Sequence, residues 1–420
     1  MTVLASVDPL FVHGHVSGVD VLILLIRLVV GWAALMGAVT MMIWFERKAI
    51  SGMQSRIGPQ RWGPFGLLQT LADGIKLFFK EDLIPEQSDR FVFKLAPYLS
   101  LVPAIVTFAI IPVGGTMHIA GHTVLLQIAN PPIGVLLMLA MSGISVYGVM
   151  LAGWASGSKY PLISSVRASA QMISYEAALG ISVVTVALIT GSLSTHNIVD
   201  AQGGWFWHWN VIRLGVVPFV IFWIAITAEL NRPPFDVVEA ESELVGGFNT
   251  EYSSIRFALF YMAEFMNTIT MSALIVTLYF GGPAGWVPPI SHLKWIFPIL
   301  WFVIKTSIFC FCYVWFRAAL PRFRYDQVMD LGWKRLIPLS LGWMLVVAGF
   351  IIKPAWGLLM AAVVLFASVL LGRAFTLGQS RETGAESVLP PIGRRPLPGE
   401  VLRAYTDRHV KITDEDEEDW

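Results

Sequence analysis

The stretch IGVLLMLAMSGISVYGVMLAGW, residues 133–154, contains no charged side chain. A helix needs about 20 apolar residues to cross the hydrocarbon core of a bilayer, and this run meets that length. The rest of the chain has a similar character, because 55% of its 420 residues are hydrophobic and 14% are charged. Soluble domains carry roughly 25% charged residues. The composition therefore predicts an all-α polytopic membrane protein.

Similar apolar runs recur along the chain and predict about eight to nine transmembrane helices. The predicted spans are 20–44, 92–113, 133–154, 164–190, 211–229, 253–280, 295–317, 336–352 and 354–372. Only Lys353 and Pro354 separate the last two runs. The sequence leaves open whether residues 336–372 form two spans or one broken element.

The distribution of basic residues predicts an orientation in the membrane. Cytoplasmic loops of membrane proteins are enriched in Lys and Arg. With the N-terminus outside, 24 of the 29 basic residues lie in the inner segments 45–94, 155–167, 230–256, 317–335 and 373–420. We expect a multi-pass protein of the inner (cell) membrane with a cytoplasmic C-terminus.

The predicted spans divide the chain into four parts. An outer N-terminal segment, 1–19, precedes the membrane helical core, 20–352, whose cytoplasmic loops carry the most unusual sequences. Residues 353–372 form an additional predicted span. The tail, 373–420, is rich in charge and proline, which predicts a disordered or partner-bound segment.

The first inner loop contains an amphipathic segment, which predicts a helix from Phe65 to Lys80 lying in the plane of the interface. One face of this helix is apolar and the other is polar. The apolar face carries Leu68, Leu71, Ile75 and Phe78, and the polar face carries Gln69, Asp73, Lys76 and Lys80. Such a helix either anchors the chain at the membrane surface or gates the entrance for an amphipathic ligand.

Two acids lie within predicted spans. Glu176 follows Arg167 by nine residues, which places it about 13 Å along the helix axis, and Glu264 follows Arg256 by a similar separation. Ionisable groups at that depth usually face an interior path or a water-filled cavity. The alternative is that each is a neutral acid that fixes two helices together.

The third inner loop, AELNRPPFDVVEAESE at 228–243, is acidic where the other inner loops are basic. Pro233 and Pro234 prevent a helix from continuing through it. We predict that its acids line a turn or cavity and titrate as a coupled group, rather than forming a solvated acidic loop. The candidate acids are Glu229, Asp236, Glu239, Glu241 and Glu243.

Several classes of function are disfavoured. The two cysteines, Cys310 and Cys312, are too few to ligate an iron–sulfur cluster, and no glycine-rich nucleotide loop is present. The histidines lack metal-ligand spacing, and the formal net charge of zero gives no bias toward nucleic acid. Lys305, inside a predicted span, either snorkels or pairs with an acid. The residues alone predict a proton-handling or ligand-admitting subunit that binds no redox cofactor or metal of its own.

The sequence resembles the membrane quinone-site subunit (the H subunit) of proton-pumping NADH:quinone oxidoreductase, respiratory complex I. The resemblance covers about residues 20 to 350. It rests on ERK at 46–48, RIGPQRWGPFGLLQTLADGIKLFFKED at 56–82, SVRASAQMISYE at 165–176, AELNRPPFDVVEAESELVGGFNTEYSS at 228–254 and LPRFRYDQVMDLGW at 320–333. The segment after Lys353 and the long tail depart from the family pattern.

The resemblance implies a division of labour among subunits. FMN and iron–sulfur clusters belong to partner subunits, quinone is the substrate, and the partners are the other complex I subunits and membrane lipids. The implied quinone-binding residues are Arg47, Asp73, Lys76, Lys80, Arg232 and Phe235. The implied catalytic acids are Glu176, Glu229, Asp236, Glu239, Glu241, Glu243 and Glu264.

Two other functions fit parts of the sequence. A membrane-bound hydrogenase or formate hydrogenlyase complex uses a homologous subunit with a different electron donor. An independent cation/proton antiporter that uses Glu176, Glu264 and Lys305 belongs to a different class. The length of the loop matches and the absence of an evident inverted repeat favour the quinone-linked enzyme.

Overall fold

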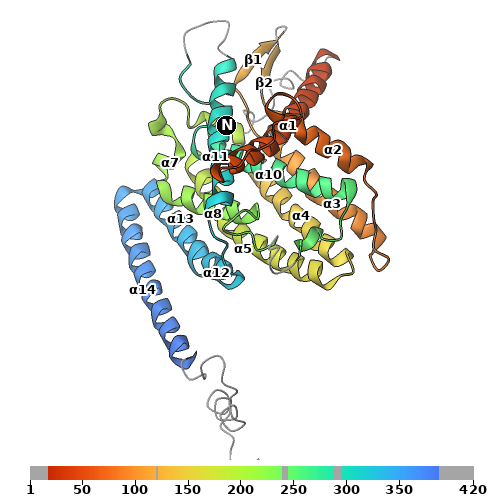
Figure 1. Cartoon of the computed structure of the whole chain (residues 1–420). Helices are drawn as coiled ribbons and strands as arrows, with labels where there is room; N and C mark the ends of the chain where they lie inside the picture. The colour runs from red at the N-terminus through yellow and green to blue at the C-terminus, as the bar shows by residue number, and fades with distance from the viewer. Residues whose placement is uncertain (1–17, 120–121, 239–244, 288–294, 387–420) are drawn as a thin grey trace, which may run out of the picture. The chain divides into compact units, whose positions relative to one another are not determined.

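A computed structural model describes residues 18–119, 122–238, 245–287 and 295–386. In this part of the chain, seven helices are long and apolar enough to cross a membrane. They are α1 (Gly18–Met53), α3 (Arg90–Ala109), α4 (Gly134–Ala155), α5 (Lys159–Thr190), α10 (Ser254–Tyr279), α11 (Ile296–Ala319) and the continuous stretch Tyr325–Ile352. The predicted all-α polytopic membrane fold is confirmed (Figure 1).

The other two predicted spans correspond to shorter apolar helices. They are α8 (Val216–Glu229) and the first part of α14 (Pro354–Glu386), whose apolar portion is Pro354–Ser368. Lys353 is extended, with φ −157° and ψ 144°, and separates α14 from α13 (Ile337–Ile352). Residues 336–372 therefore contain two helices. The chain divides into two compact units at Gly357, and the site described below belongs to the first.

Short elements connect the long helices. The single described hairpin pairs β1 (Thr116–Ile119) with β2 (His122–Leu125) in antiparallel register, with Thr116 opposite Leu125. The short helical elements are η3 (Pro64–Gly66), α2 (Gln69–Phe79), α6 (Thr195–Asp200), η4 (Phe206–His208), α7 (Asn210–Arg213), η5 (Gly247–Asn249), α12 (Tyr325–Asp330) and the π-helical segment η7 (Leu331–Leu336).

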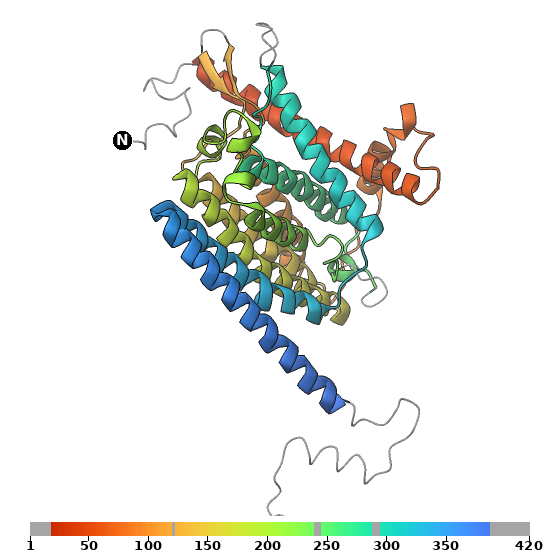
Figure 2. The same ribbon diagram turned by 90° about the vertical axis from the view of Figure 1, so that its left-hand side faces the viewer.

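The helices of the first unit pack around three clusters of buried apolar side chains. α4 contacts both α3 and α5, α5 contacts α8 and α13, and α10 contacts α3 and α11. α1 contacts α10 and α11 and crosses α11 in Figure 2. The hairpin lies near the start of α1 and α2 near its end, so we name these two sides the hairpin end and the α2 end.

At the hairpin end, polar side chains bind the backbone where α10 finishes. Gln202 donates its amide to Thr277 O at 3.0 Å, and Asn210 donates to Leu278 O at 2.9 Å. Lys305 donates its ammonium to three carbonyls, those of Phe280, Gly282 and Ala284, at 2.8, 3.1 and 2.6 Å. Because these oxygens lie in or after the last turn of α10, they need outside donors.

Within the described residues, Lys305 thus binds backbone carbonyls and does not pair with an acid, and whether it snorkels stays a prediction. Its ammonium also lies 4.5 Å from the centre of the Trp209 ring, an arrangement that attracts a cation. The three carbonyls that accept from this lysine all lie in the loop that follows α10. The Lys305 ammonium therefore stabilises the backbone at the hairpin end.

At the α2 end, the amphipathic helix begins later than the sequence predicted. Phe65 and Gly66 have positive φ angles of 55° and 77°, which interrupt a helix before Gln69. A Cβ atom on Gly66 would lie 2.5 Å from the carbonyl carbon of Pro59, so only glycine fits this close approach. The regular helix is thus α2, Gln69–Phe79.

Candidate functional site

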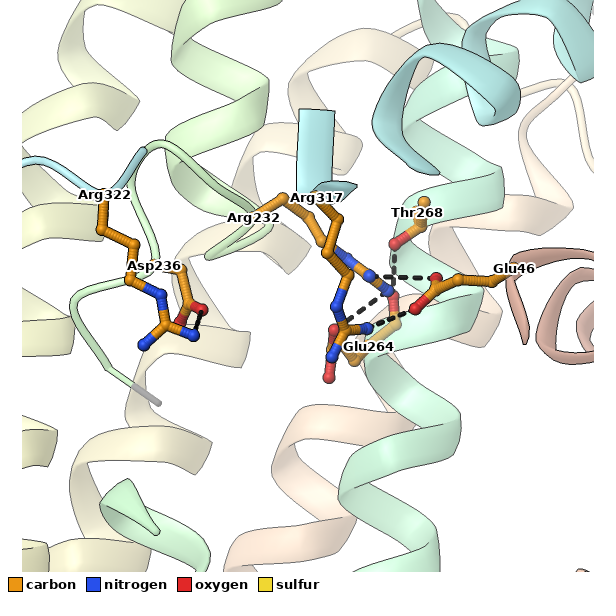
Figure 3. Close-up of polar contacts among 7 residues, drawn as sticks. All are labelled: Glu46, Arg232, Asp236, Glu264, Thr268, Arg317 and Arg322. Carbon is orange, nitrogen blue, oxygen red and sulfur yellow. Dashed lines mark hydrogen bonds and ion pairs between the residues drawn. The ribbon is translucent and has the colours of Figure 1, made fainter. Parts of the chain in front are cut away.

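A buried arginine joins three segments at the α2 end. Arg232 follows α8, and its side chain is 2% exposed. Its Nη1 lies 3.0 Å from Oε2 of Glu46 on α1, and its Nη2 lies 3.0 Å from Oε1 of Glu264 on α10 (Figure 3). The guanidinium also lies 5.1 Å from the centre of the Phe265 ring.

Arg317, near the end of α11, completes this group by pairing with the other oxygen of Glu46. Burying an isolated charge is costly, and pairing with hydrogen bonds offsets that cost. Here two carboxylates face two guanidiniums, so the formal charges cancel within the group. We call Glu46, Arg232, Glu264 and Arg317 the ion cluster. The cluster holds α1, α10, α11 and the loop after α8 together.

A second ion pair lies beside the ion cluster. Oδ2 of Asp236 is 3.0 Å from Nη2 of Arg322, which follows α11 (Figure 3). The Asp236 side chain is buried, whereas that of Arg322 is half exposed. The loop after α8 thus forms ion pairs at two positions. Arg232 pairs with side chains on α1 and α10, and Asp236 pairs with a side chain that follows α11.

A cavity adjoins the ion cluster and contains two of the predicted acids. Its volume is about 80 Å³, and both Glu229 and Glu264 line it. Its other polar lining residues are Ser100, Ser145, Asn231, Asn249 and Asn267. The apolar lining comes from Val149, Met172, Leu230, Val238, Phe248, Phe260, Tyr261, Ala263 and Met271.

Several polar atoms on this wall lack a protein partner among the described residues. Ser142 donates its hydroxyl to Oε1 of Glu229, but Oε2 of Glu229 has no hydrogen-bond partner there. The same holds for Oδ1 of Asn249 and the hydroxyl of Ser100. Buried polar atoms are normally satisfied by protein or by ordered water. The cavity is therefore polar enough to hold water molecules that reach Glu229.

Glu176 is on α5 and is not among the residues that line the cavity. Its carboxylate lies against α4, because a Cβ atom on Gly143 would be 3.1 Å from Oε1 of Glu176. The absence of a side chain at Gly143 makes room for this carboxylate. The structure thus places the Glu176 carboxylate against α4, outside the ion cluster that holds Glu264.

Four of the residues that the resemblance implies for quinone binding lie on α2, directly after it, or near the end of α1. Asp73 accepts from Nη1 of Arg47 at 2.5 Å, and Nζ of Lys76 lies 3.9 Å from Asp73. The apolar side chains of α2 point away from the bundle, with Phe78 69% exposed. Ser254 on α10 donates its hydroxyl to Lys80 O at 2.7 Å. α2 thus lies against α1 on one side and is tied to α10 at its end.

Two of the predicted quinone-binding residues are in unexpected surroundings. Phe235 is 3% exposed and packs against Tyr175 and Phe323, with ring centres 5.3 and 5.6 Å away. Arg232 is occupied by two carboxylates. Neither lines the cavity, and their contact with quinone stays a prediction. Glu239, Glu241 and Glu243 lie outside the described residues.

Several side chains in this region were not among the candidates from sequence. Glu46 and Arg317 belong to the ion cluster, Arg322 pairs with Asp236, and Ser142 binds Glu229. Glu46 did stand in the quoted ERK motif, but its partners are 186 and 271 residues away in the chain. No local spacing reveals such a pairing. Within the described ranges, no group of three His, Cys, Asp or Glu residues could hold a metal ion.

The fold and the site together define a class: a polytopic helical membrane protein with an ion cluster, centred on a buried arginine, beside an acid-lined polar cavity. Comparison with known proteins makes the assignment specific. Residues 26–348 match the family model described as NADH dehydrogenase. The chain belongs to the family of NADH-quinone oxidoreductase H subunits.

Its relatives cover much of the chain. The NADH-quinone oxidoreductase H subunit of Frankia alni is 51% identical over 316 residues, which are 73% of this chain and 68% of the relative. The H subunit of Streptomyces avermitilis is 47% identical over 337 residues, which are 78% of this chain and 72% of the relative. An H subunit of Koribacter versatilis, numbered 2, is 46% identical over 347 residues, covering 79% of this chain and 97% of the relative.

Proposed function

We propose that this chain is the subunit of a proton-translocating NADH:quinone oxidoreductase that helps form the quinone tunnel and docks the peripheral redox arm. Family membership supports the assignment to that enzyme. In this assembly the chain binds no redox cofactor itself, and FMN and iron–sulfur clusters are in partner subunits. The N-terminus is outside the inner (cell) membrane, and the α2 end, where the basic loops gather, is cytoplasmic.

The observation that carries the coupling role is the shared cavity wall of Glu229 and Glu264. Reduction of a quinone to a quinol takes up two electrons and two protons. Carboxylates beside a water-accessible cavity can give and receive those protons. Glu264 is also part of the ion cluster, so a change in its charge alters the balance of that cluster directly.

The ion pairs of the ion cluster can change when negative charge develops on a quinone nearby. Arg232 binds Glu46 and Glu264 at the same time. A negative charge that develops on a nearby quinone competes with these carboxylates for the arginines. Since the cluster joins α1, α10 and α11, such competition biases the relative positions of these helices. We propose this as the local step that links quinone reduction to proton movement.

The α2 helix suits a tunnel entrance. Its exposed apolar face meets lipid, while its polar face binds α1 through Asp73 and Arg47. An isoprenoid quinone has an apolar tail and a polar headgroup, and a helix with those two faces matches both. Arg47, Asp73, Lys76 and Lys80 are proposed to contact the quinone as it enters.

The direct test is capture of the intact assembly. The chain is purified from gently solubilised membranes by an affinity tag, its partners are identified, and NADH:quinone activity is measured. A large assembly with flavin and iron–sulfur subunits and inhibitor-sensitive NADH oxidation is expected. A nickel–iron hydrogenase partner would instead assign the chain to the hydrogenase class. A lone chain that exchanges protons for cations in liposomes would support an antiporter.

A further inference from the structure

The loop after α8, residues 230–238, carries Arg232 and Asp236 but has no regular secondary structure of its own. Asn231 has a positive φ of 50°, which is uncommon for a residue other than glycine. A loop in such a conformation depends on its surroundings to hold it. Two groups outside the predicted site supply contacts on different sides of this loop.

The first group is Gln171 on α5. Its amide nitrogen donates to Ala228 O at 2.8 Å and Phe235 O at 3.0 Å, and lies 3.2 Å from Oδ1 of Asn231. Its side chain is fully buried. Because all three neighbours of Nε2 are oxygen acceptors, a donor is required at that position. Gln171 thus fixes the carbonyl just before Glu229 and the carbonyl just before Asp236.

The second group is the short segment that follows α11. Besides pairing with Asp236 through Arg322, it donates the Phe323 backbone N–H to Pro234 O at 2.9 Å. The ring of Phe323 packs edge-on against that of Phe235. Three contacts from two adjacent residues therefore hold three consecutive residues of the loop, Pro234 to Asp236.

Resting on the proposed function, we infer that Gln171 and Arg322 are positioning residues for quinone-linked chemistry. They act through the loop that carries Arg232 and Asp236, and not by touching the substrate. Arg322 acts through Asp236, and Gln171 acts through the backbone on both sides of the loop. Loss of the Arg322 or the Gln171 side chain displaces Asp236 or Glu229. The rate of quinone reduction then falls, while the affinity for quinone stays nearly unchanged.

The test for Arg322 is a double-mutant cycle in the whole enzyme. Arg322→Met should lower kcat for NADH:quinone turnover about tenfold with KM for quinone nearly unchanged, while Arg322→Lys restores most of the rate. When Asp236 is already Asn, Arg322→Met should have no further effect. The control is Lys334→Met, which breaks the neighbouring exposed pair with Asp330 and should leave kcat unchanged.

The test for Gln171 uses a matched glutamine. Gln202 is also buried and donates to two carbonyls, Ile198 O and Thr277 O, but it lies at the hairpin end. Gln171→Glu places a carboxylate against three oxygens and should lower kcat about tenfold. Gln202→Glu removes the same kind of bond and should lower thermal stability without changing kcat per assembled enzyme.

A measurement independent of activity separates this inference from the proposed function. Hydrogen exchange in the assembled complex should be faster at the Phe235 and Val237 amides in Arg322→Met and Gln171→Glu, but not in Lys334→Met or Gln202→Glu. Unchanged exchange, or additive effects of the Arg322 and Asp236 substitutions, would overturn the positioning role. Absence of NADH:quinone activity in the unaltered complex would instead defeat the proposed function.

Discussion

Arg232 binds Glu46 and Glu264 through different nitrogens, each 3.0 Å from a carboxylate oxygen, so that one guanidinium links α1 to α10. The chain separation between Arg232 and Glu46 is 186 residues. Because the arginine is almost fully buried, its charge is balanced by protein groups rather than by bulk water. This link makes the ion cluster a structural joint as well as the polar border of the cavity.

Removal of that arginine should be severe. Arg232→Met leaves the buried Glu46 and the partly exposed Glu264 with one fewer positive charge, and an uncompensated buried charge typically costs about 3–5 kcal/mol. We expect little assembled enzyme and a lower thermal midpoint for what does assemble. Arg213→Met is the control, because that exposed arginine donates to Ala201 O at the hairpin end, away from the ion cluster. Normal yield and stability of Arg232→Met would contradict the joint.

Lys305 gives the opposite prediction. Lys305→Met removes the donor from three carbonyls at the hairpin end, and each buried acceptor left unsatisfied costs about 1–3 kcal/mol. The thermal midpoint should therefore fall. Quinone turnover per assembled complex should stay normal, since the lysine pairs with none of the candidate acids that the structure describes.

The control for this substitution is Lys353→Met, which alters an exposed lysine between α13 and α14. It should leave the thermal midpoint unchanged. If Lys305→Met abolished turnover while stability stayed normal, Lys305 would have a chemical role, as the antiporter hypothesis requires.

Gly143 offers a way to perturb Glu176 without replacing it. A Cβ atom at Gly143 would lie 3.1 Å from Oε1 of Glu176, so Gly143→Ala must displace the carboxylate slightly. We expect quinone turnover to fall about threefold, in the range by which small geometric changes alter catalysis. Gly180→Ala on α5 is matched, because no atom lies within 4 Å of its Cβ position. Replacing Gly by Ala within a helix stabilises the helix by about 1 kcal/mol at either position, so the two variants differ only in the contact with the Glu176 carboxylate.

Equal turnover of Gly143→Ala and Gly180→Ala would show that the position of Glu176 is unimportant. A parallel comparison with Glu176→Gln identifies whether charge or position matters. We expect Glu176→Gln to assemble normally and to depress quinone reduction, measured against NADH oxidation by a hydrophilic acceptor.

Asp73 tests the tunnel entrance. Its pair with Arg47 is partly exposed, and exposed pairs contribute about 0–1 kcal/mol, so Asp73→Asn should assemble normally. If α2 guides quinone inward, the KM for quinone should rise about threefold, which corresponds to less than about 1.4 kcal/mol of binding free energy. An unchanged KM for long-tailed and short-tailed quinones alike would remove Asp73 from the path.

Much of the fold follows from local sequence. The uncharged run 133–154 becomes α4 at Gly134–Ala155, and the run 253–280 becomes α10 at Ser254–Tyr279. An apolar stretch of that length has few alternatives in a bilayer, because its backbone groups must bond to one another. The late start of α2 was missed, since the positive φ of Phe65 depends on packing around Gly66 and Pro59.

The site was predicted in part. Glu229 and Glu264 stood out as acids in or beside apolar runs, and both line the cavity. Arg317 and Gln171 did not stand out, because a basic residue near a helix end and a glutamine in a helix are ordinary features. Their roles arise from segments distant in the chain that meet in the fold. The partners of Lys305 could not be predicted for the same reason, because its three carbonyl acceptors depend on the conformation of the loop after α10.

The role of the cavity acids in coupling is best tested by replacing Glu229 and Glu264 singly with Gln in the assembled enzyme, reconstituted into vesicles. NADH:quinone turnover and proton pumping are measured together, and NADH oxidation by a hydrophilic acceptor reports on the peripheral arm. We expect intact acceptor reduction, with quinone turnover and pumping depressed about tenfold or more. Full quinone turnover with undiminished pumping in both variants would contradict the coupling role.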